Sequence, residues 1–236
     1  MPKTIADRIA VLDWPGIAGA LDAHGSATTG QILSPKECAD LAALYQEDAP
    51  FRSRVVMARH GFGSGEYKYF AVPLPAPIAA LRESLYPRLA EIANRWQARL
   101  GGKAYPERHG DYLKQCHAAG QKRPAPLLLK YESGDYNCLH QDLYGELAFP
   151  LQATILLSAP DQDFTGGEFL LTEQRPRMQS RGEVVTLRQG EAVFFAVNQR
   201  PVQGKRGTYR VTMRHGVSRL KSGRRFSLGI IFHDAK

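Results

Sequence analysis

Apolar residues in the first part of the chain recur at the spacing of α-helices and are separated by residues that cap helices. Ile5 and Ile9 lie on one face of a first expected helix, and a second helix is expected to end near Gly25. Residues 34–37, Ser-Pro-Lys-Glu, form a capping box with proline in the first turn. This box predicts a helix over about residues 35–46.

Residues 51–72 break the helical pattern and predict a β-hairpin, because β-branched and aromatic residues flank a glycine-rich tip at 61–65. Helical spacing returns over residues 81–96 and stops at Gly101. A shorter helix is expected to follow, with Asp111 as its N-cap.

From residue 126 onward the pattern becomes one of short β-strands separated by glycine-containing turns. The expected strands cover residues 127–132, 136–141, 148–158, 167–172, 183–188, 191–197, 208–217 and 225–233. Strands of this length and number predict a β-sandwich or a jelly-roll barrel, and we expect the jelly roll, or double-stranded β-helix. The predicted fold class is α+β with one domain over 1–236. Residues 1–125 form a mainly helical N-terminal support layer, and residues 126–236 form the double-stranded β-helix core.

The composition is that of an ordinary globular chain, with 236 residues, 43% apolar and 23% charged positions. No apolar run approaches the roughly 20 residues that span a bilayer, and no secretory signal is recognisable. Three cysteines without C-x-x-C spacing argue against a disulfide framework and against a cysteine-rich zinc site. We therefore expect a cytoplasmic protein that does not bind membranes. The sequence does not decide the oligomeric state, and a monomer would suffice.

The net charge of +8 is unevenly distributed, because residues 172–236 carry 14 Lys and Arg against 4 Asp and Glu. Residues 1–171 therefore sum to −2. A basic third of a chain is typical of a polyanionic partner, of which nucleic acid is the commonest. A solvated basic surface without a partner explains the same composition, and the sequence leaves both interpretations open.

His140 and Asp142 stand at the end of an expected strand, where residues two apart point to the same side. His215, on another expected strand, would add a second imidazole, although alone it would more often be a packed core histidine. Two imidazoles and one carboxylate leave positions open on Fe(II) for a chelating co-substrate and O₂. A second H-x-D pattern at residues 109–111 is set aside, because it falls at a helix start where Asp111 serves as N-cap.

Arg225 and Ser227 come shortly after His215 and share one face of the last expected strand. A guanidinium binds a carboxylate through two parallel hydrogen bonds, and a hydroxyl can take a remaining lone pair. We expect this pair to hold a carboxylate, because an ordinary surface salt bridge would not account for its position beside the distal histidine.

Several ordered motifs together resemble the 2-oxoglutarate/Fe(II) dioxygenase superfamily over residues 126–233. The matching segments are 131–142 (YESGDYNCLHQD), 165–169 (TGGEF), 190–195 (GEAVFF), 215–217 (HGV) and 225–227 (RFS). The resemblance implies that His140, Asp142 and His215 bind iron. It also implies that Arg225 and Ser227 hold the distal carboxylate of 2-oxoglutarate, to which Tyr131 adds a hydrogen bond.

The chain as a whole also resembles a bacterial group of this superfamily assigned to oxidative demethylation of damaged DNA. The resemblance implies an enzyme with Fe(II) as cofactor, 2-oxoglutarate and O₂ as co-substrates, and single- or double-stranded DNA as partner. In such a reaction 2-oxoglutarate becomes succinate and CO₂, and the hydroxylated N-methyl group leaves as formaldehyde. Tyr136 and Cys138 alternate onto the face of His140, where they either line the pocket or pack in the barrel core.

Three functions remain open. A nucleic-acid demethylase is supported by the basic C-terminal third and by cations and aromatic residues of the 51–72 hairpin, which suit phosphate contacts and base stacking. A hydroxylase of protein side chains or small molecules is the alternative, since the same motifs resemble prolyl-hydroxylase-type enzymes. A non-catalytic nucleic-acid-binding module is disfavoured by the complete set of metal and anchor residues.

Basic residues of the hairpin and of the C-terminal third are the candidates for contacting DNA. These are Arg52, Arg54, Lys68, Lys205, Arg206, Arg219, Lys221 and Arg224. Lys205 and Arg206 are expected in a loop near the mouth of the barrel, where a flipped or single-stranded base would enter.

Overall fold

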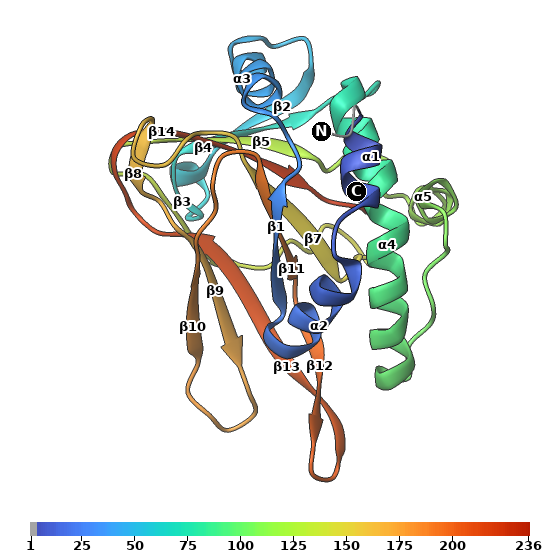
Figure 1. The fold of residues 1–236 in the computed structure, drawn as a ribbon. Coiled ribbons are helices and arrows are strands. Elements are labelled where there is room, and N and C mark those ends of the chain that lie inside the picture. Colours follow the sequence, from blue (N-terminus) through green and yellow to red (C-terminus); the bar gives the residue numbers. More distant parts are fainter. Residues whose placement is uncertain (1–3) are drawn as a thin grey trace.

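The computed structural model describes residues 4–236 (Figure 1). Its helices are α1 (Ile5–Ala10), α2 (Trp14–His24), α3 (Pro35–Ala43), α4 (Ala76–Leu100) and α5 (His109–Ala118), with short 3₁₀ turns at Leu44–Gln46 and Met57–Arg59. Its strands are β1 (Ser26–Gln31), β2 (Phe51–Val56), β3 (Gly63–Ser64), β4 (Glu66–Phe70), β5 (Leu127–Glu132), β6 (Tyr136–His140), β7 (Leu151–Leu156), β8 (Phe164–Gly166), β9 (Phe169–Gln174), β10 (Arg181–Val185), β11 (Glu191–Ala196), β12 (Gln199–Gly204), β13 (Gly207–Val217) and β14 (Leu220–Ile230).

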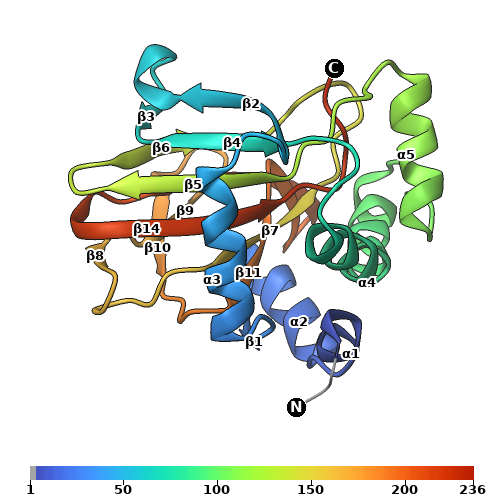
Figure 2. The same ribbon diagram turned by 90° about the horizontal axis from the view of Figure 1, so that it is seen from above.

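The strands form two antiparallel sheets (Figures 1 and 2). The larger sheet has the order β1-β11-β7-β14-β5-β4-β2, with β8 paired to β14. The smaller sheet has the order β10-β9-β13-β6-β3, with β12 paired to β13. An apolar cluster joins them, since Phe169 and Leu171 of the smaller sheet pack with Leu156 and Phe195 of the larger one. The predicted α+β class with a jelly-roll core is confirmed.

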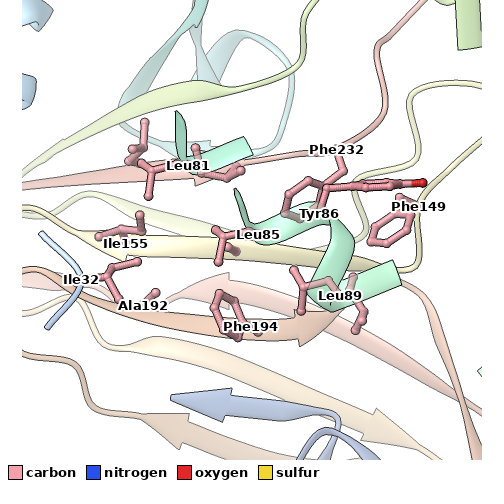
Figure 3. Packing of buried hydrophobic residues seen from close by; sticks show 14 of the residues in the cluster. Ile32, Leu81, Leu85, Tyr86, Leu89, Phe149, Ile155, Ala192, Phe194 and Phe232 are labelled. Carbon is pink, nitrogen blue, oxygen red and sulfur yellow. The ribbon is translucent and has the colours of Figure 1, made fainter. Parts of the chain in front are cut away.

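The central strands of the larger sheet are buried on both faces. In β7, Ala153 and Ile155 point to the helical layer, whereas Gln152 and Thr154 point into the interior between the sheets. The helical side is covered by α4, whose leucines pack onto β7, β11 and β14 (Figure 3). One face of β7 therefore contributes side chains to the hydrophobic core, and the other face lines the interior cavity.

Capping residues set the helix ends largely as the sequence predicts. Ser34 and Glu37 form the capping box of α3, and Gly25 and Gly101 end α2 and α4 in the left-handed conformation, which costs glycine little. The expected N-cap role of Asp111 is wrong. Helix α5 starts two residues before it, after Arg108, and Asp111 lies inside the first turn.

Three strands escape the sequence pattern. β1 is rich in polar and small residues and forms an edge of the larger sheet, so its sequence shows no apolar alternation. β12 contains Pro201, which an edge strand tolerates, and β8 spans only Phe164–Gly166. The 51–72 hairpin forms as β2 and β4. Within residues 4–236, no helix combines the length and hydrophobicity needed to cross a bilayer.

Candidate active site

His140, Asp142 and His215 converge in the interior between the two sheets. Nε2 of His140 lies 3.4 Å from Oδ1 of Asp142, and Nε2 of His215 lies 3.3 Å from Oδ2. The three ligand atoms all lie within 4.8 Å of one another. Asp142 and His215 are buried, whereas His140 is partly exposed. This spacing allows all three side chains to hold one metal ion.

Strand pairing places the two imidazoles together. His140 ends β6 directly opposite His215 on β13, and their ring centroids are 4.2 Å apart. Nδ1 of His140 donates a hydrogen bond to the carbonyl of Cys138 (2.8 Å), which leaves the Nε2 lone pair facing Asp142. Gln141 points away and donates to Oδ1 of Asn198 and the carbonyl of Met213, both at 2.8 Å. The side chain of Gln141 thereby anchors the backbone between His140 and Asp142.

The electrostatics of the group favour an ionised aspartate. Burial alone raises the pKa of Asp142, but hydrogen bonds and charge from His140 and His215 outweigh it and hold the pKa well below its usual range. Burial lowers the pKa of His215 despite its contact with Asp142, so that this imidazole favours the neutral form. Burial lowers the pKa of His140, but its hydrogen bond to Asp142 and the charge of that carboxylate outweigh burial and raise the pKa. A metal ion would bind the deprotonated imidazoles together with the ionised carboxylate.

Tyr144 is a partner of Asp142 that the sequence does not reveal. Its hydroxyl donates to Oδ1 of Asp142 at 2.6 Å, and burial raises the pKa of the phenol well above its usual range. The hydrogen bond fixes the orientation of the carboxylate. Tyr144 lies in the loop after β6, where neither helical nor strand periodicity applies, so only its closeness to Asp142 in sequence could have suggested it.

A cavity of about 280 Å³ extends from this group to Arg225 and Ser227 on β14. Arg225 is 2% exposed, and its Nη1 donates to the hydroxyl of Ser227 at 3.1 Å. Among residues 4–236, no carboxylate lies within ion-pair distance of this guanidinium, and its Nε has no hydrogen-bond partner. Burial lowers the pKa of Arg225. A buried, unpaired cation facing a cavity is costly unless an anionic ligand completes it.

Tyr131 lines the same cavity from β5. Its ring lies 5.6 Å from the guanidinium carbon of Arg225, and its hydroxyl accepts a hydrogen bond from Asn137 at 3.3 Å. The structure therefore brings all six residues singled out from the sequence to one cavity.

Tyr136 departs from the expectation, whereas Cys138 lines the cavity, which is one of the two expected outcomes. Both are exposed, so neither packs in the barrel core, and only Cys138 borders the cavity. Tyr136 pairs with Ser64 at the outer edge of the smaller sheet.

The H-x-D pattern at residues 109–111 serves the fold. His109 is buried, and its Nε2 donates to the carbonyl of Phe232 at 2.8 Å. Asp111 forms surface ion pairs with Arg108 and Lys114. The two side chains have separate partners and form no cluster with a third metal-binding group among residues 4–236.

Several of the proposed DNA-contacting residues have structural partners instead. Lys68 is buried and binds Asp48 and two backbone carbonyls, so a phosphate cannot reach it. Arg54 pairs with Glu66, and Arg52 stacks over the ring of Tyr69 at 4.4 Å. Expecting Lys68 at the surface was therefore wrong.

Lys205 and Arg206 are exposed, but they lie at the tip of the β12–β13 hairpin. His215 lies eight positions after Gly207 along β13, which corresponds to about 26 Å at the rise of a strand. The hairpin projects away from the rest of the barrel (Figure 1), so its predicted place near the cavity mouth is wrong. Arg219, Lys221 and Arg224 are exposed around the start of β14, and Arg224 pairs with Glu132.

Known structures share this fold. A prolyl hydroxylase in complex with a hypoxia inducible factor peptide fragment, from Trichoplax adhaerens, is 14% identical, with a TM-score of 0.58 over 96% of this chain and 90% of that one. An oxidoreductase of the 2OG-Fe(II) oxygenase family from Burkholderia pseudomallei is 15% identical, with a TM-score of 0.55 over 94% and 92%. A Pseudomonas putida prolyl-4-hydroxylase is 15% identical, with a TM-score of 0.53 over 94% and 100%.

Two curated relatives are much closer in sequence. The uncharacterized proteins MT2286 and Rv2227, from two strains of Mycobacterium tuberculosis, are each 53% identical over 167 residues, covering 70% of this chain and 72% of theirs. Residues 65–235 match the family model Oxygenase-NA, described as "Oxygenase, catalysing oxidative methylation of damaged DNA". The predicted place in the 2-oxoglutarate/Fe(II) oxygenase superfamily is confirmed, and the chain belongs to its Oxygenase-NA family.

Proposed function

We propose that this enzyme is an Fe(II)- and 2-oxoglutarate-dependent dioxygenase that removes methyl groups oxidatively from damaged bases of DNA. His140, Asp142 and His215 would hold the iron, since two neutral nitrogens and one carboxylate are the donor set that non-haem Fe(II) oxygenases use. Arg225 and Ser227 would hold the distal carboxylate of 2-oxoglutarate, with Tyr131 beside them.

The observation that carries the proposal is the charge balance of one cavity. It contains a metal-binding group around a buried carboxylate and, separate from it, a buried guanidinium without an acidic partner. A ligand that chelates a metal at one end and presents a carboxylate at the other satisfies both. 2-Oxoglutarate has this arrangement of groups.

Iron held by these residues would supply the oxidation: 2-oxoglutarate would lose CO₂ and take one oxygen atom of O₂ to become succinate, and the other oxygen atom would be inserted into a C–H bond of the substrate. The chain's own residues orient the reactants. Arg225 fixes one end of the co-substrate, Tyr144 holds the carboxylate of Asp142, and the apolar lining limits the access of water. A hydroxylated N-methyl group then breaks its C–N bond and leaves as formaldehyde.

Nucleic acid as substrate is supported by the family description and by the basic C-terminal third. Lys205, Arg206, Arg219 and Lys221 are exposed and available to phosphates. The tyrosines of the hairpin offer no exposed stacking surface, because Tyr67 lines the cavity and Tyr69 is buried in an apolar cluster.

The test is succinate formation by His140→Ala and Asp142→Ala, with His24→Ala as the matched control on the exposed end of α2. Loss of 2-oxoglutarate turnover is expected in the first two variants with the fold intact, and full turnover in the control. Activity retained by both site variants would refute the metal assignment. Formaldehyde release from methylated single- and double-stranded oligonucleotides then tests the substrate. Succinate without formaldehyde would exclude demethylation and leave the dioxygenase class in place.

A hydroxylase of protein side chains is the second candidate, favoured by the fold shared with prolyl hydroxylases. Proline-containing peptides offered in the same assay distinguish the two. A non-catalytic nucleic-acid-binding module is disfavoured because it would need neither the metal group nor Arg225.

A further inference from the structure

The interior cavity divides into a charged part and an uncharged lobe. Its charged or ionisable site residues are those already assigned, on the metal group and at Arg225. The remaining lining consists of apolar and neutral polar side chains and three glycines. They include Tyr67, Leu127, Gln152, Thr154 and Gly229. A group without a localised charge fits this lobe, whereas a carboxylate or an ammonium would enter it unpaired.

Gln152 is the polar group of this lobe that lacks a partner. It is 3% exposed, and its Oε1 has no hydrogen-bond partner among residues 4–236. A buried amide oxygen without a donor is uncommon in proteins and calls for a ligand or an ordered water. Thr154, two residues further along β7, pairs with Gly229 on β14, where the side chain of Leu127 packs against the glycine.

The position of Gln152 relative to the metal group follows from strand pairing. Gln152 on β7 lies opposite Phe195 on β11, on the same face of the sheet. The ring of Phe195 in turn contacts His215, with ring centroids 4.6 Å apart. Arg225 pairs with Tyr131 further along β14, well beyond Gly229. Gln152 is therefore close to the metal group but away from the end that Arg225 defines.

An aromatic pair borders the mouth of the cavity. Phe62 is 47% exposed and lines the opening, and the ring of His60 stacks on it at 5.3 Å and 24°. The carbonyl of Phe62 accepts a hydrogen bond from the amide of Cys138, which ties this loop to β6 next to His140. An exposed, supported ring at a cavity entrance offers a stacking surface for another planar ring.

We propose that Gln152 is a specificity-determining residue, which accepts a hydrogen bond from an N–H group of a methylated base that has entered past Phe62. The inference rests on the proposed function and names the part of the base that is recognised. A base with an exocyclic amino group supplies the missing donor, whereas a base with a carbonyl there would face Oε1 with a second acceptor. A prolyl side chain has no N–H, so a prolyl hydroxylase would leave Gln152 unpaired.

The experiment compares wild type with Gln152→Met, which keeps the length of the side chain but loses the acceptor. Gln162→Met, in an exposed turn, is the matched control. The probes are labelled single-stranded oligonucleotides that carry either 3-methylcytosine or 3-methylthymine. Anisotropy is measured anaerobically on protein loaded with Fe(II) and 2-oxoglutarate, and formaldehyde release is measured in air.

We expect wild type and the control to prefer 3-methylcytosine, and Gln152→Met to lose roughly 10- to 100-fold in affinity for it. Affinity of Gln152→Met for 3-methylthymine should change little. Phe62→Leu should weaken both probes about tenfold, because it removes the stacking ring. Succinate formed without substrate is compared between wild type and Gln162→Met, whose cavity is intact, and its absence in both would refute the dioxygenase assignment separately from this proposal.

Equal loss on both probes, or no loss in Gln152→Met, would overturn the proposal while the demethylase function stands. If wild type released formaldehyde from neither probe yet hydroxylated a prolyl peptide equally well with Gln152→Met, both the substrate class and the role of Gln152 would be wrong.

Discussion

Two buried arginines of this protein have opposite surroundings. Arg82, on α4, donates to three backbone carbonyls at residues 231–233 and to Oδ1 of Asp234 at 2.7 Å. Arg225, equally buried, has one hydroxyl and no acid among the residues that the structure describes. The first arginine is completed by the fold and holds the C-terminal segment in place. Arg225 has no carboxylate partner within the described residues, as expected for an arginine that binds a ligand and not for one in a structural ion pair.

The largest loss of stability should come from replacing Arg82, the arginine with a full set of partners in the fold. Arg82→Met leaves Asp234 and three carbonyls buried without their donor, and should lower the free energy of unfolding by about 3–5 kcal/mol. Arg225→Met removes an unpaired buried charge and should leave the stability of the metal-free protein unchanged or slightly raised. Urea denaturation measures both. Equal destabilisation of the two variants would show that Arg225 also has a structural role.

Acid should weaken the region around Arg82 through His109. Burial lowers the pKa of His109 to about 4, from an ordinary 6.5. The unfolded chain therefore binds the proton first, and the stabilisation is complete above pH 6.5 and lost as the pH falls toward 4. The loss amounts to roughly 3 kcal/mol. His109→Gln should flatten the pH dependence of unfolding over this range, and a slope identical to wild type would contradict the assignment.

Binding of 2-oxoglutarate should stabilise the protein through Arg225, the buried arginine that has no carboxylate partner. With Fe(II) bound anaerobically, 2-oxoglutarate at a hundred times its dissociation constant should add about 2.7 kcal/mol to wild type. Arg225→Lys should lose most of this protection and raise the KM for 2-oxoglutarate, because an ammonium cannot reproduce the planar fork. Thermal shift and succinate assays measure the two effects. Unchanged values would show that Arg225 does not anchor 2-oxoglutarate.

The smallest expected effect is on DNA binding and concerns the exposed cations Lys205 and Arg206. Lys205→Glu with Arg206→Glu should weaken DNA binding and flatten its salt dependence, because fewer counterions are released. The tip of the β12–β13 hairpin lies about 26 Å from His215. One DNA strand advances about 3.4 Å per nucleotide along the helix axis. The effect should therefore appear only for oligonucleotides that extend some eight nucleotides beyond the methylated base. Lys36→Glu on α3 is the control, and equal losses at every length would contradict the prediction.

The metal group was predictable because it rests on local rules. Alternation places His140 and Asp142 on one side of a strand end, and the motif order identifies His215 and Arg225. Tyr144 was not predictable, since it lies in a loop whose course depends on tertiary packing. Gln152 escaped for a different reason. In a strand buried on both faces, the sequence does not show which face adjoins the cavity.

The errors among the basic residues have the same origin. Lys68 alternates with two tyrosines and looked like part of a charged surface, but its strand is covered on the side where Asp48 binds it. Lys205 precedes the strand of His215 in sequence, yet an eleven-residue strand carries it far from the cavity. Proximity along the chain does not predict proximity in space when an extended element intervenes.

The pairing of His140 with His215 across β6 and β13 ties the site to a single strand register. A slip of one residue would turn His215 to the opposite face while leaving the strands paired and the molecule collapsed. Circular dichroism and size-exclusion chromatography would not distinguish such a register-shifted chain from the native one. Quality of a preparation is therefore better graded by its metal stoichiometry, because a chain that takes up one equivalent of metal has registered these two strands correctly.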